Sequence, residues 1–197
     1  MSPPPDFESG TSTSDVVIDF SHPSSVLSHL DLCLAMKKSI VIGTTGWETS
    51  HDQARQRIEE AKGSCLYSPN FSIGIFLFNQ IVAHAAQLLQ KFPEYDVAGV
   101  EAHHRQKVDS PSGTAKALSD TLLHNMPRLK DFNFSSIRCG SIPGTHTLYF
   151  DSNVDTLTLT HEARNREGFA HGAVIGAEWL IGRQGFFTMK DMMMGEL

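Results

Sequence analysis

Short apolar segments alternate with amphipathic segments over the first half of the chain. Residues 15–20 and 39–42 are rich in β-branched side chains and end at turn-forming residues, which is typical of buried strands. Apolar positions at helical spacing follow the first of them, over residues 26–34. A charged helix over residues 50–61 should follow the second, opened by a Ser-x-x-Gln capping box.

The alternation continues with a third short strand at residues 64–67 and a long apolar helix over residues 74–90. Strands that alternate with helices indicate a parallel sheet covered by helices. The sequence therefore predicts an α/β fold with a partial Rossmann-type parallel sheet. The long helix should bury one side, formed by Phe78, Ile81, Val82, Ala85 and Leu89.

After residue 92 the pattern changes to strand-like segments around a single helix, residues 115–124. This predicts an α+β C-terminal domain with a four-stranded mixed sheet. Residues 156–160 alternate strictly, so one face of that strand should be buried and the other polar. A last helix over residues 168–181 should return the chain to the first region. The four strands are expected at residues 96–103, 134–138, 145–150 and 156–161.

These elements predict a domain organisation with an interrupted first domain. Residues 1–14 are rich in Pro, Ser and Thr and should form a disordered tail without the features of a signal peptide. Residues 15–92 and 182–197 should form one domain, and residues 93–181 should form a second.

Composition narrows the choice of ligand. The chain has 197 residues, 40% of them hydrophobic, which is enough for a sizeable core. Its formal charge of −6 and the absence of a basic stripe argue against nucleic acid or an anionic membrane as a partner. A small molecule fits better, and no apolar run reaches the roughly 20 residues of a membrane helix. The three cysteines show no paired spacing and are expected to be reduced thiols in the cytoplasm.

The densest cluster of polar residues lies at the end of a predicted strand, over residues 101–109. It contains His103, His104, Arg105 and Lys107, whose charges suit carboxylates and whose imidazoles exchange protons near neutral pH. Such a cluster is also found in solvated surface loops, so its spacing alone leaves function and surface equally probable.

A helix start follows this cluster directly, at residues 110–115. Backbone amides at a helix start, together with the hydroxyl of Thr114, form a ready site for an anion. An ordinary Ser/Thr cap would be the simpler interpretation if the basic cluster were absent. Side by side, the two features suit a ligand with two carboxylates.

The stretch from Glu101 to Ala115 reads E-A-H-H-R-Q-K-V-D-S-P-S-G-T-A and resembles the signature of the dihydrodipicolinate reductase family. Members of this family are 4-hydroxy-tetrahydrodipicolinate reductases. The likeness covers nearly everything after the tail, because it continues at residues 17–21, 42–46, 69–74 and 169–173.

The resemblance implies an oxidoreductase of lysine and diaminopimelate biosynthesis, assembled as a homotetramer, that uses NADH or NADPH to reduce 4-hydroxy-tetrahydrodipicolinate to tetrahydrodipicolinate. It makes residues 15–92 and 182–197 a partial dinucleotide-binding domain and residues 93–181 a domain for substrate binding and tetramerisation. It assigns acid/base catalysis to His103 and proton donation to Lys107. It assigns binding of the substrate carboxylates to His104, Gly113 and Thr114. Residues at the nicotinamide side of the cofactor would be Phe20, Gly43, Thr44, Thr45, Ser68, Pro69, Asn70 and Phe71.

The chain departs from the family in one major respect. Family members open with a G-x-G-x-x-G turn that brings the backbone close to the cofactor pyrophosphate, and no G-x-G occurs in this sequence. A second hypothesis is therefore a truncated, non-catalytic homologue that binds a dicarboxylate or associates with other subunits without productive cofactor binding. The histidines show no ligand spacing, so no metal site is predicted.

Overall fold

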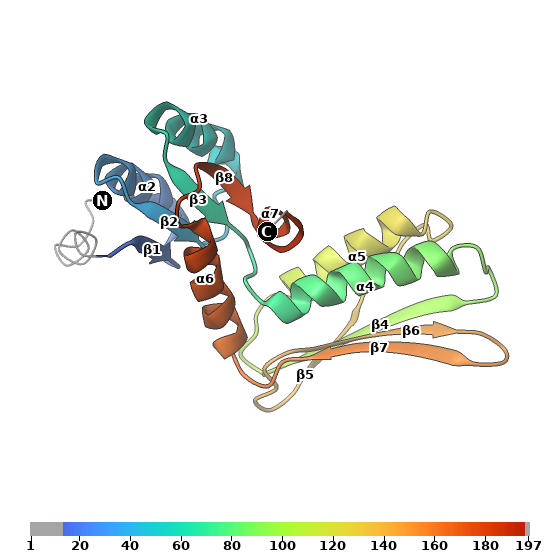
Figure 1. Ribbon diagram of the computed structural model, residues 1–197. Coiled ribbons are helices and arrows are strands. Elements are labelled where there is room, and N and C mark those ends of the chain that lie inside the picture. The colour runs from blue at the N-terminus through green and yellow to red at the C-terminus, as the bar shows by residue number, and fades with distance from the viewer. Residues whose placement is uncertain (1–13, 196–197) are drawn as a thin grey trace. The chain divides into compact units, whose positions relative to one another are not determined.

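The computed structural model describes residues 14–195 and divides the chain into two compact units (Figure 1). Unit 1 comprises residues 1–72 and 169–197, and unit 2 comprises residues 73–168. The predicted tail, residues 1–14, lies outside the described residues except for Ser14. Among the described helices, none combines the length and the hydropathy needed to cross a bilayer.

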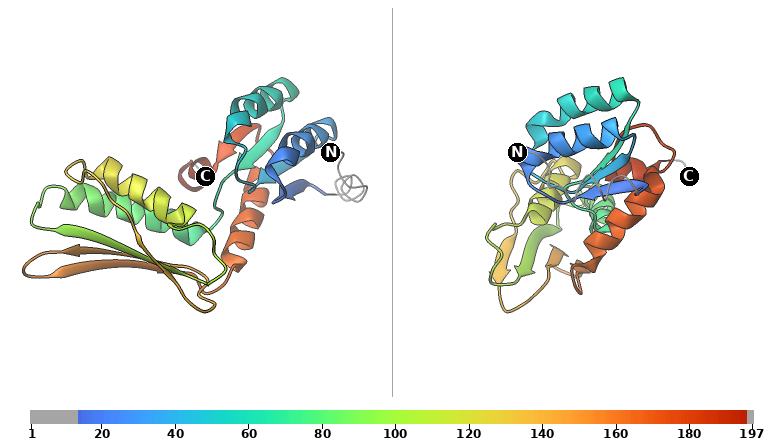
Figure 2. Two further views of the ribbon diagram at one scale, coloured as in Figure 1. Left: turned by 180° about the vertical axis from the view of Figure 1, so that it is seen from behind. Right: turned by 90° about the vertical axis from the view of Figure 1, so that its left-hand side faces the viewer.

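Unit 1 is built on a parallel sheet of four strands in the order β1-β2-β3-β8. Helices α2 and α3 lie on one face of this sheet and α6 lies on the other, as Figures 1 and 2 show. This arrangement confirms the predicted partial Rossmann-type fold. The strands are β1 (Val16–Asp19), β2 (Ser39–Ile42), β3 (Ser64–Tyr67) and β8 (Gly185–Thr188), and the helices are α2 (Val26–Ala35), α3 (His51–Ala61), α6 (Glu167–Leu180) and α7 (Met189–Met194), with single 3-10 turns at Pro23–Ser25 and Glu48–Ser50.

Two local expectations for unit 1 differ from the structure. The hydroxyl of Ser50 makes no capping hydrogen bond, because a 3-10 turn precedes α3 and places Ser50 at its end. The capping box predicted there is wrong. A capping box does form at α7, between Thr188 and Asp191, in a segment where no helix was expected.

Helix α6 lies very close to the carboxyl end of β3. A Cβ atom added to Gly172 would fall 1.8 Å from the carbonyl oxygen of Phe71. One added to Gly176 would fall 2.6 Å from Cδ2 of Leu66. Because the two glycines have no side chains, the helix can lie this close to the sheet.

Unit 2 is a four-stranded mixed sheet in the order β5-β4-β6-β7, in which β5 runs parallel to β4 and the other pairs are antiparallel. Helices α4 and α5 lie side by side on one face, and in the described part of the chain no helix covers the other face (Figures 1 and 2). The predicted mixed sheet is confirmed. The elements are α4 (Ile73–Leu89), β4 (Asp96–His103), α5 (Gly113–Asn125), β5 (Ser135–Arg138), β6 (Thr145–Asp151) and β7 (Thr156–Glu162).

The core of unit 2 lies between the two helices and the sheet. Four residues of α4 enter it, and these pack the helix against α5. The unit boundaries thus differ from the expected domain limits at residues 92/93 and 181/182, because α4 belongs to unit 2 and most of α6 to unit 1. The core residues are Phe78, Val82, Ala86, Leu89, Ala115, Leu118, Leu122, Met126, Phe132, Phe134, Leu148 and Phe150.

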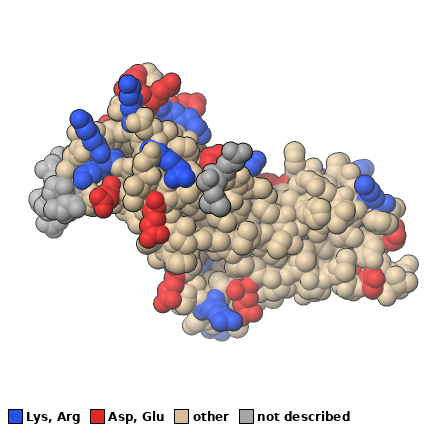
Figure 3. Space-filling view, in the orientation of Figure 1, with Lys and Arg blue, Asp and Glu red and all other residues tan. Residues whose placement is uncertain are grey.

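The exposure of side chains in unit 2 differs from the buried faces predicted for α4 and β7. Ile81 is 53% exposed, because the buried side of α4 follows residues 78, 82, 86 and 89 and turns Ile81 away from α5. Figure 3 shows that the surface over α4 carries few charged side chains. In β7 the predicted alternation is weak: Leu159 is half-buried and Leu157 is 48% exposed, since β7 is an edge strand.

The contact between α6 and β3 predicts a large difference between two glycines of the same helix. Gly172→Ala should lower the free energy of unfolding by about 1–3 kcal/mol, because the methyl group overlaps the backbone of Phe71. Gly168→Ala is the matched control: nothing lies within 4 Å of its added Cβ, and alanine favours the helix. Urea denaturation of both variants checks this, and equal stability would contradict the tight packing.

Candidate active site

The end of β4 sends two ionisable side chains into the interior of unit 2. Residues two apart on a strand share a face, so Glu101 and His103 point together toward the helices, while Ala102 points to the opposite face. Glu101 is completely buried and His103 is 6% exposed. A carboxyl group without any exposure needs partners for its charge.

Strand register brings these partners beside Glu101. Ser136 of β5 lies opposite Glu101, and Arg138 lies opposite His103. On the other side, His146 of β6 lies opposite Glu101. Three strands thus place polar groups at one end of the sheet.

The carboxylate of Glu101 is held by hydrogen bonds from three residues. The backbone amide of Ser112 donates to both carboxylate oxygens, at 3.1 and 3.2 Å. The Ser136 hydroxyl donates to Oε1 at 2.7 Å, and Nη2 of Arg138 donates to the same oxygen at 2.8 Å. Ser112 is the N-cap of α5, so the carboxylate joins the helix start to two strands.

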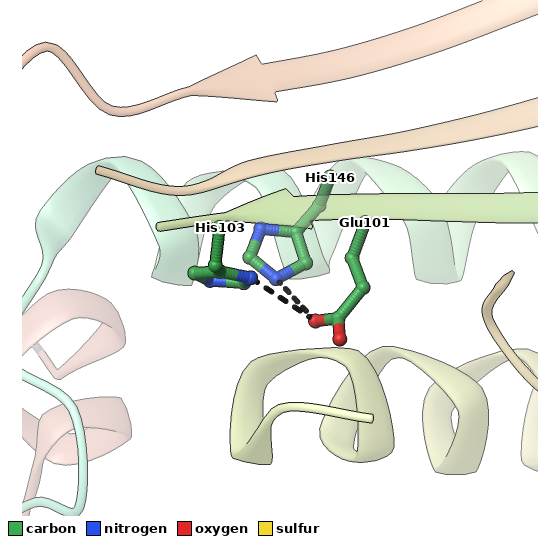
Figure 4. A group of neighbouring side chains, drawn as sticks. All are labelled: Glu101, His103 and His146. Atoms are coloured by element: carbon green, nitrogen blue, oxygen red, sulfur yellow. Dashed lines mark ion pairs between the residues drawn. The ribbon is translucent and has the colours of Figure 1, made fainter. Parts of the chain in front are cut away.

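Two imidazoles lie against the other carboxylate oxygen (Figure 4). Nδ1 of His103 is 3.5 Å and Nε2 of His146 is 3.6 Å from Oε2 of Glu101. The two rings meet edge to face, with their centroids 5.2 Å apart. Nε2 of His146 also lies 3.2 Å from the hydroxyl of Ser112, whose oxygen accepts a hydrogen bond from the amide of Ala115.

The surroundings change the protonation of these groups in opposite senses. Burial disfavours the charged form of Glu101, but hydrogen bonds from Ser112, Ser136 and Arg138 outweigh it and lower the pKa to about 2. Burial, reinforced by the charge of His103, lowers the pKa of His146 to about 4. The pKa of His103 is also lowered, by burial first, and Glu101 opposes that effect.

The start of α5 faces the cationic end of the predicted cluster. Nζ of Lys107 donates to Oδ1 of Asp109 at 2.7 Å, and the amide of Gly113 donates to Oδ2 of the same carboxylate at 3.2 Å. A lysine and a helix start together therefore hold a carboxylate, here one from the chain itself. Hydrogen bonding to Lys107 is the main cause of a lowered pKa at Asp109.

The remaining residues predicted to hold substrate lie beside this pair. Thr114 is half-buried in the first turn of α5, next to Gly113. His104 is half-buried, and its carbonyl oxygen accepts a hydrogen bond from the amide of Lys107 at 3.2 Å. The amides of Ser112, Gly113 and Ala115 were expected to be free for a ligand, but each already donates to a side chain.

Several residues of this network had no role in the sequence interpretation. Glu101 and Asp109 were recognised only as letters of the motif, and Ser136, Arg138 and His146 lie on other strands. The i, i+2 spacing of Glu101 and His103 was a signal that both share a face. The residues that β5 and β6 place beside Glu101 depend on strand register, which cannot be read from the sequence alone.

The residues predicted for the nicotinamide side follow three neighbouring strands of unit 1. Phe20 follows β1, Gly43–Thr45 follow β2, and Ser68–Phe71 follow β3. Adjacent parallel strands end at the same edge, which is where open α/β sheets bind ligands. These loops therefore fit one end of a dinucleotide.

Packing divides these cofactor-side residues into two groups. Thr44, Ser68 and Phe71 are buried and shape the loops, whereas Phe20 and Thr45 are exposed. The ring of Phe20 packs on Phe71, with centroids 5.9 Å apart. It also fills the space beside Gly43, where an added Cβ would fall 2.1 Å from the ring. An exposed aromatic ring between two loops suits stacking against a planar group.

A buried contact between a histidine and an aspartate supports the first of these loops. Nδ1 of His29 lies 3.0 Å from Oδ2 of Asp19, and the amide of Ser21 donates to Oδ1 at 2.8 Å. The hydroxyl of Thr44 donates to Oδ1 at 3.5 Å. Asp19 thus joins the ends of β1 and β2. Ser21 and Asp19 both lie on the same nitrogen of His29, so the three do not form a nucleophile–base–acid relay.

Glu101, His103 and His146 also have the composition of a metal site. One ligand atom from each lies within 4.8 Å of the others. The carboxylate, however, already accepts hydrogen bonds from Ser112, Ser136 and the cationic Arg138. A guanidinium on the same carboxylate opposes binding of a second cation, so the cluster fits a hydrogen-bonded array better than a metal ion.

The neutral state of buried His146 predicts a pH-dependent stability. Its pKa of about 4 lies below the usual 6.5, so between these values the unfolded chain binds more protons and stability falls as the pH falls. His146→Gln removes this contribution, at most about 1.4 kcal/mol per pH unit. Urea denaturation at pH 5 and 6.5 should show a shallower slope in the variant, and an unchanged slope would contradict a buried neutral imidazole. Above pH 7.5 the two proteins should depend on pH alike.

Comparisons with known proteins place this geometry in a family. A family model described as "Dihydrodipicolinate reductase, N-terminus" matches residues 5–71, and one described as "Dihydrodipicolinate reductase, C-terminus" matches residues 74–193. A 4-hydroxy-tetrahydrodipicolinate reductase from Christiangramia forsetii is 36% identical over 189 residues, covering 91% of this chain and 79% of that protein.

Comparison with solved structures indicates the same family. A dipicolinate-bound dihydrodipicolinate reductase from Paenisporosarcina sp. TG-14 superposes with a TM-score of 0.77 at 26% identity, covering 91% of this chain and 73% of that chain. An amine dehydrogenase from Mycobacterium smegmatis shares the fold alone, with a TM-score of 0.52 at 10% identity over 90% and 75% of the two chains. The chain belongs to the dihydrodipicolinate reductase family.

Proposed function

We propose that this chain reduces 4-hydroxy-tetrahydrodipicolinate to tetrahydrodipicolinate with NADH or NADPH, as a cytoplasmic step of lysine and diaminopimelate biosynthesis. The observation that carries the proposal is the carboxylate held jointly by Lys107 and the amide of Gly113. The proposal is supported by the names of the relatives, one of which is a structure with dipicolinate, a ring with two carboxylates.

The substrate carboxylates would be held at the start of α5. A carboxylate in the place of the Asp109 side chain meets a cation and a helix start, both of which favour negative charge. Thr114 adds a hydroxyl in the same turn, and His104 adds an imidazole at the end of β4. These groups orient the ring beside His103.

Proton supply falls to His103 and Lys107. The overall change replaces the 4-hydroxyl group by hydrogen and releases water, so it consumes one hydride and one proton. The nicotinamide cofactor supplies the hydride when it is bound. His103 turns Nδ1 toward Glu101, which leaves Nε2 as the nitrogen for proton transfer. Lys107 offsets the negative charge that develops on the ring.

Cofactor binding would use the three loops of unit 1. Phe20 and Thr45 offer exposed surface at the carboxyl edge of the sheet, and buried Thr44 and Ser68 fix the backbone around them. Gly43, Pro69, Asn70 and Phe71 complete the two later loops.

A second candidate function is a homologue that binds the dicarboxylate ring without productive cofactor binding. It is motivated by residues 1–197, which contain no G-x-G turn for a pyrophosphate. The two functions differ in one property, affinity for the reduced cofactor. Calorimetric titrations with NADH, NADPH and pyridine-2,6-dicarboxylate therefore separate them. Micromolar binding of either cofactor supports the reductase, and binding of the dicarboxylate alone supports the second candidate.

The reductase predicts loss of turnover in two variants. His103→Ala removes the proton-transfer group and Lys107→Ala removes the cation, so each should lower kcat/KM by about 100-fold or more. The measurement follows oxidation of NADH and NADPH with freshly generated substrate, and far-UV circular dichroism checks folding. The control is Lys116→Ala, an exposed lysine on α5 outside the site. Turnover at the wild-type rate in either site variant would remove the role assigned to it.

The same proposal includes a homotetramer, whose interface would be the uncovered face of the unit 2 sheet. That face presents Tyr149 and Ile137, which are 38% and 49% exposed and would be covered by such an interface. Light scattering should give four times the chain mass. Tyr149→Asp should lower that mass, and a monomeric wild-type protein would contradict the assembly.

A further inference from the structure

Glu101 takes no part in the proposed proton transfer, yet it contacts every element of the site in unit 2. Its Oε1 is held by Ser136 and Arg138 of β5, and its Oε2 faces the two imidazoles. The amide of Ser112 binds both oxygens. The carboxylate is therefore fixed from one side and presents its other oxygen to His103 and His146.

This geometry determines which nitrogen of His103 is available. A carboxylate beside Nδ1 favours the proton on that nitrogen, although 3.5 Å is longer than a hydrogen bond. Nε2 is the other ring nitrogen, and a Cβ atom added to Gly144 would lie only 3.1 Å from it. Glycine at that position leaves room beside the nitrogen that the reaction requires.

His146 couples the carboxylate to the start of α5. Its Nε2 lies near both Oε2 of Glu101 and the hydroxyl of Ser112, at 3.6 and 3.2 Å. That hydroxyl caps the helix by accepting from the amide of Ala115. A change at His146 therefore reaches the turn that contains Gly113 and Thr114.

We propose that Glu101 and His146 are positioning residues of the reductase, which fix the imidazole of His103 and the first turn of α5 in one arrangement. Glu101 holds the Nδ1 side of His103 and stabilises its protonated form. His146 transmits the same constraint to the turn that binds substrate carboxylates. The inference rests on the function proposed above, because it assigns these residues to that reaction.

The charged and titratable groups around His103 set the sign of the expected effect. Burial lowers its pKa, and the charges of Lys107 and Arg138 lower it further, while Glu101 and Asp109 raise it. His146, the remaining neighbour, is neutral above its pKa of about 4. Removal of the Glu101 charge should therefore lower the pKa of His103 further, and a proton-donating His103 should lose activity at lower pH.

The first test uses Glu101→Gln, which keeps the shape of the side chain and removes its charge. Nuclear magnetic resonance of the imidazoles should show the protonation midpoint of His103 moving down by about one pH unit. The basic limb of kcat should move with it, and kcat near neutral pH should fall about tenfold. Wild-type midpoints and a wild-type pH profile in the folded variant would overturn the role of Glu101.

His146→Gln tests the proposed effect of His146 on the first turn of α5. Affinity for pyridine-2,6-dicarboxylate, measured by calorimetry, should fall about tenfold because the capped turn loses a constraint, and KM should rise with it. The matched control is His161→Gln, the strand neighbour of His146 that makes no contact with Glu101 among the interactions described. It should leave affinity, KM and the pH profile unchanged. Equal effects of the two substitutions would contradict the positioning role of His146 and show that it contributes only to packing.

A further variant covers the case in which Glu101→Gln does not fold. Ser136→Ala removes the 2.7 Å hydrogen bond to Oε1 and keeps the charge, so the carboxylate should attract the protonated imidazole of His103 more strongly. A small upward shift of the His103 midpoint is expected, opposite to that of Glu101→Gln, and no shift would overturn the proposal. The imidazole titration and the calorimetry do not depend on turnover. An inactive wild-type chain that shows both effects would therefore refute the reductase function and leave the positioning geometry intact.

Discussion

The buried charge of Glu101 is the constraint on which the site in unit 2 depends. A carboxylate without solvent contact is unfavourable unless nearly every acceptor position has a donor. Its donors come from the N-cap of α5 and from β5, and the imidazoles beside it come from β4 and β6. The hydrogen bonds and contacts of this one carboxylate thus fix four elements at one end of the sheet, where α5 begins.

This end of unit 2 contains a buried and a solvent-exposed group of charged residues. Inside, Glu101 is ionised and His146 is neutral, because hydrogen bonds stabilise the first charge and burial disfavours the second. Outside, Lys107 and the start of α5 hold a carboxylate in contact with solvent. The net charge of −6 does not conflict with the proposed dianionic substrate, since binding depends on local donors and not on the total charge.

Periodicity and motif together predicted most of the fold, and the failures have physical causes. The helices and strands followed from apolar spacing, because each element buries one face. Ile81 was placed on the wrong side of α4, since a long apolar helix offers two candidate faces and only its packing against α5 decides. The short segment 185–194 carries too few residues for a periodic signal, so β8 and α7 were missed. The network of Glu101 needs strand register, and a motif read along one segment does not contain it.

The most direct test is a crystal structure of the chain with pyridine-2,6-dicarboxylate. The account predicts one ligand carboxylate within hydrogen-bond distance of Lys107 and the first turn of α5. It also predicts the ring beside Nε2 of His103, with Oε2 of Glu101 still facing both imidazoles. A ligand bound elsewhere, or a Glu101 side chain turned away from both histidines, would contradict it.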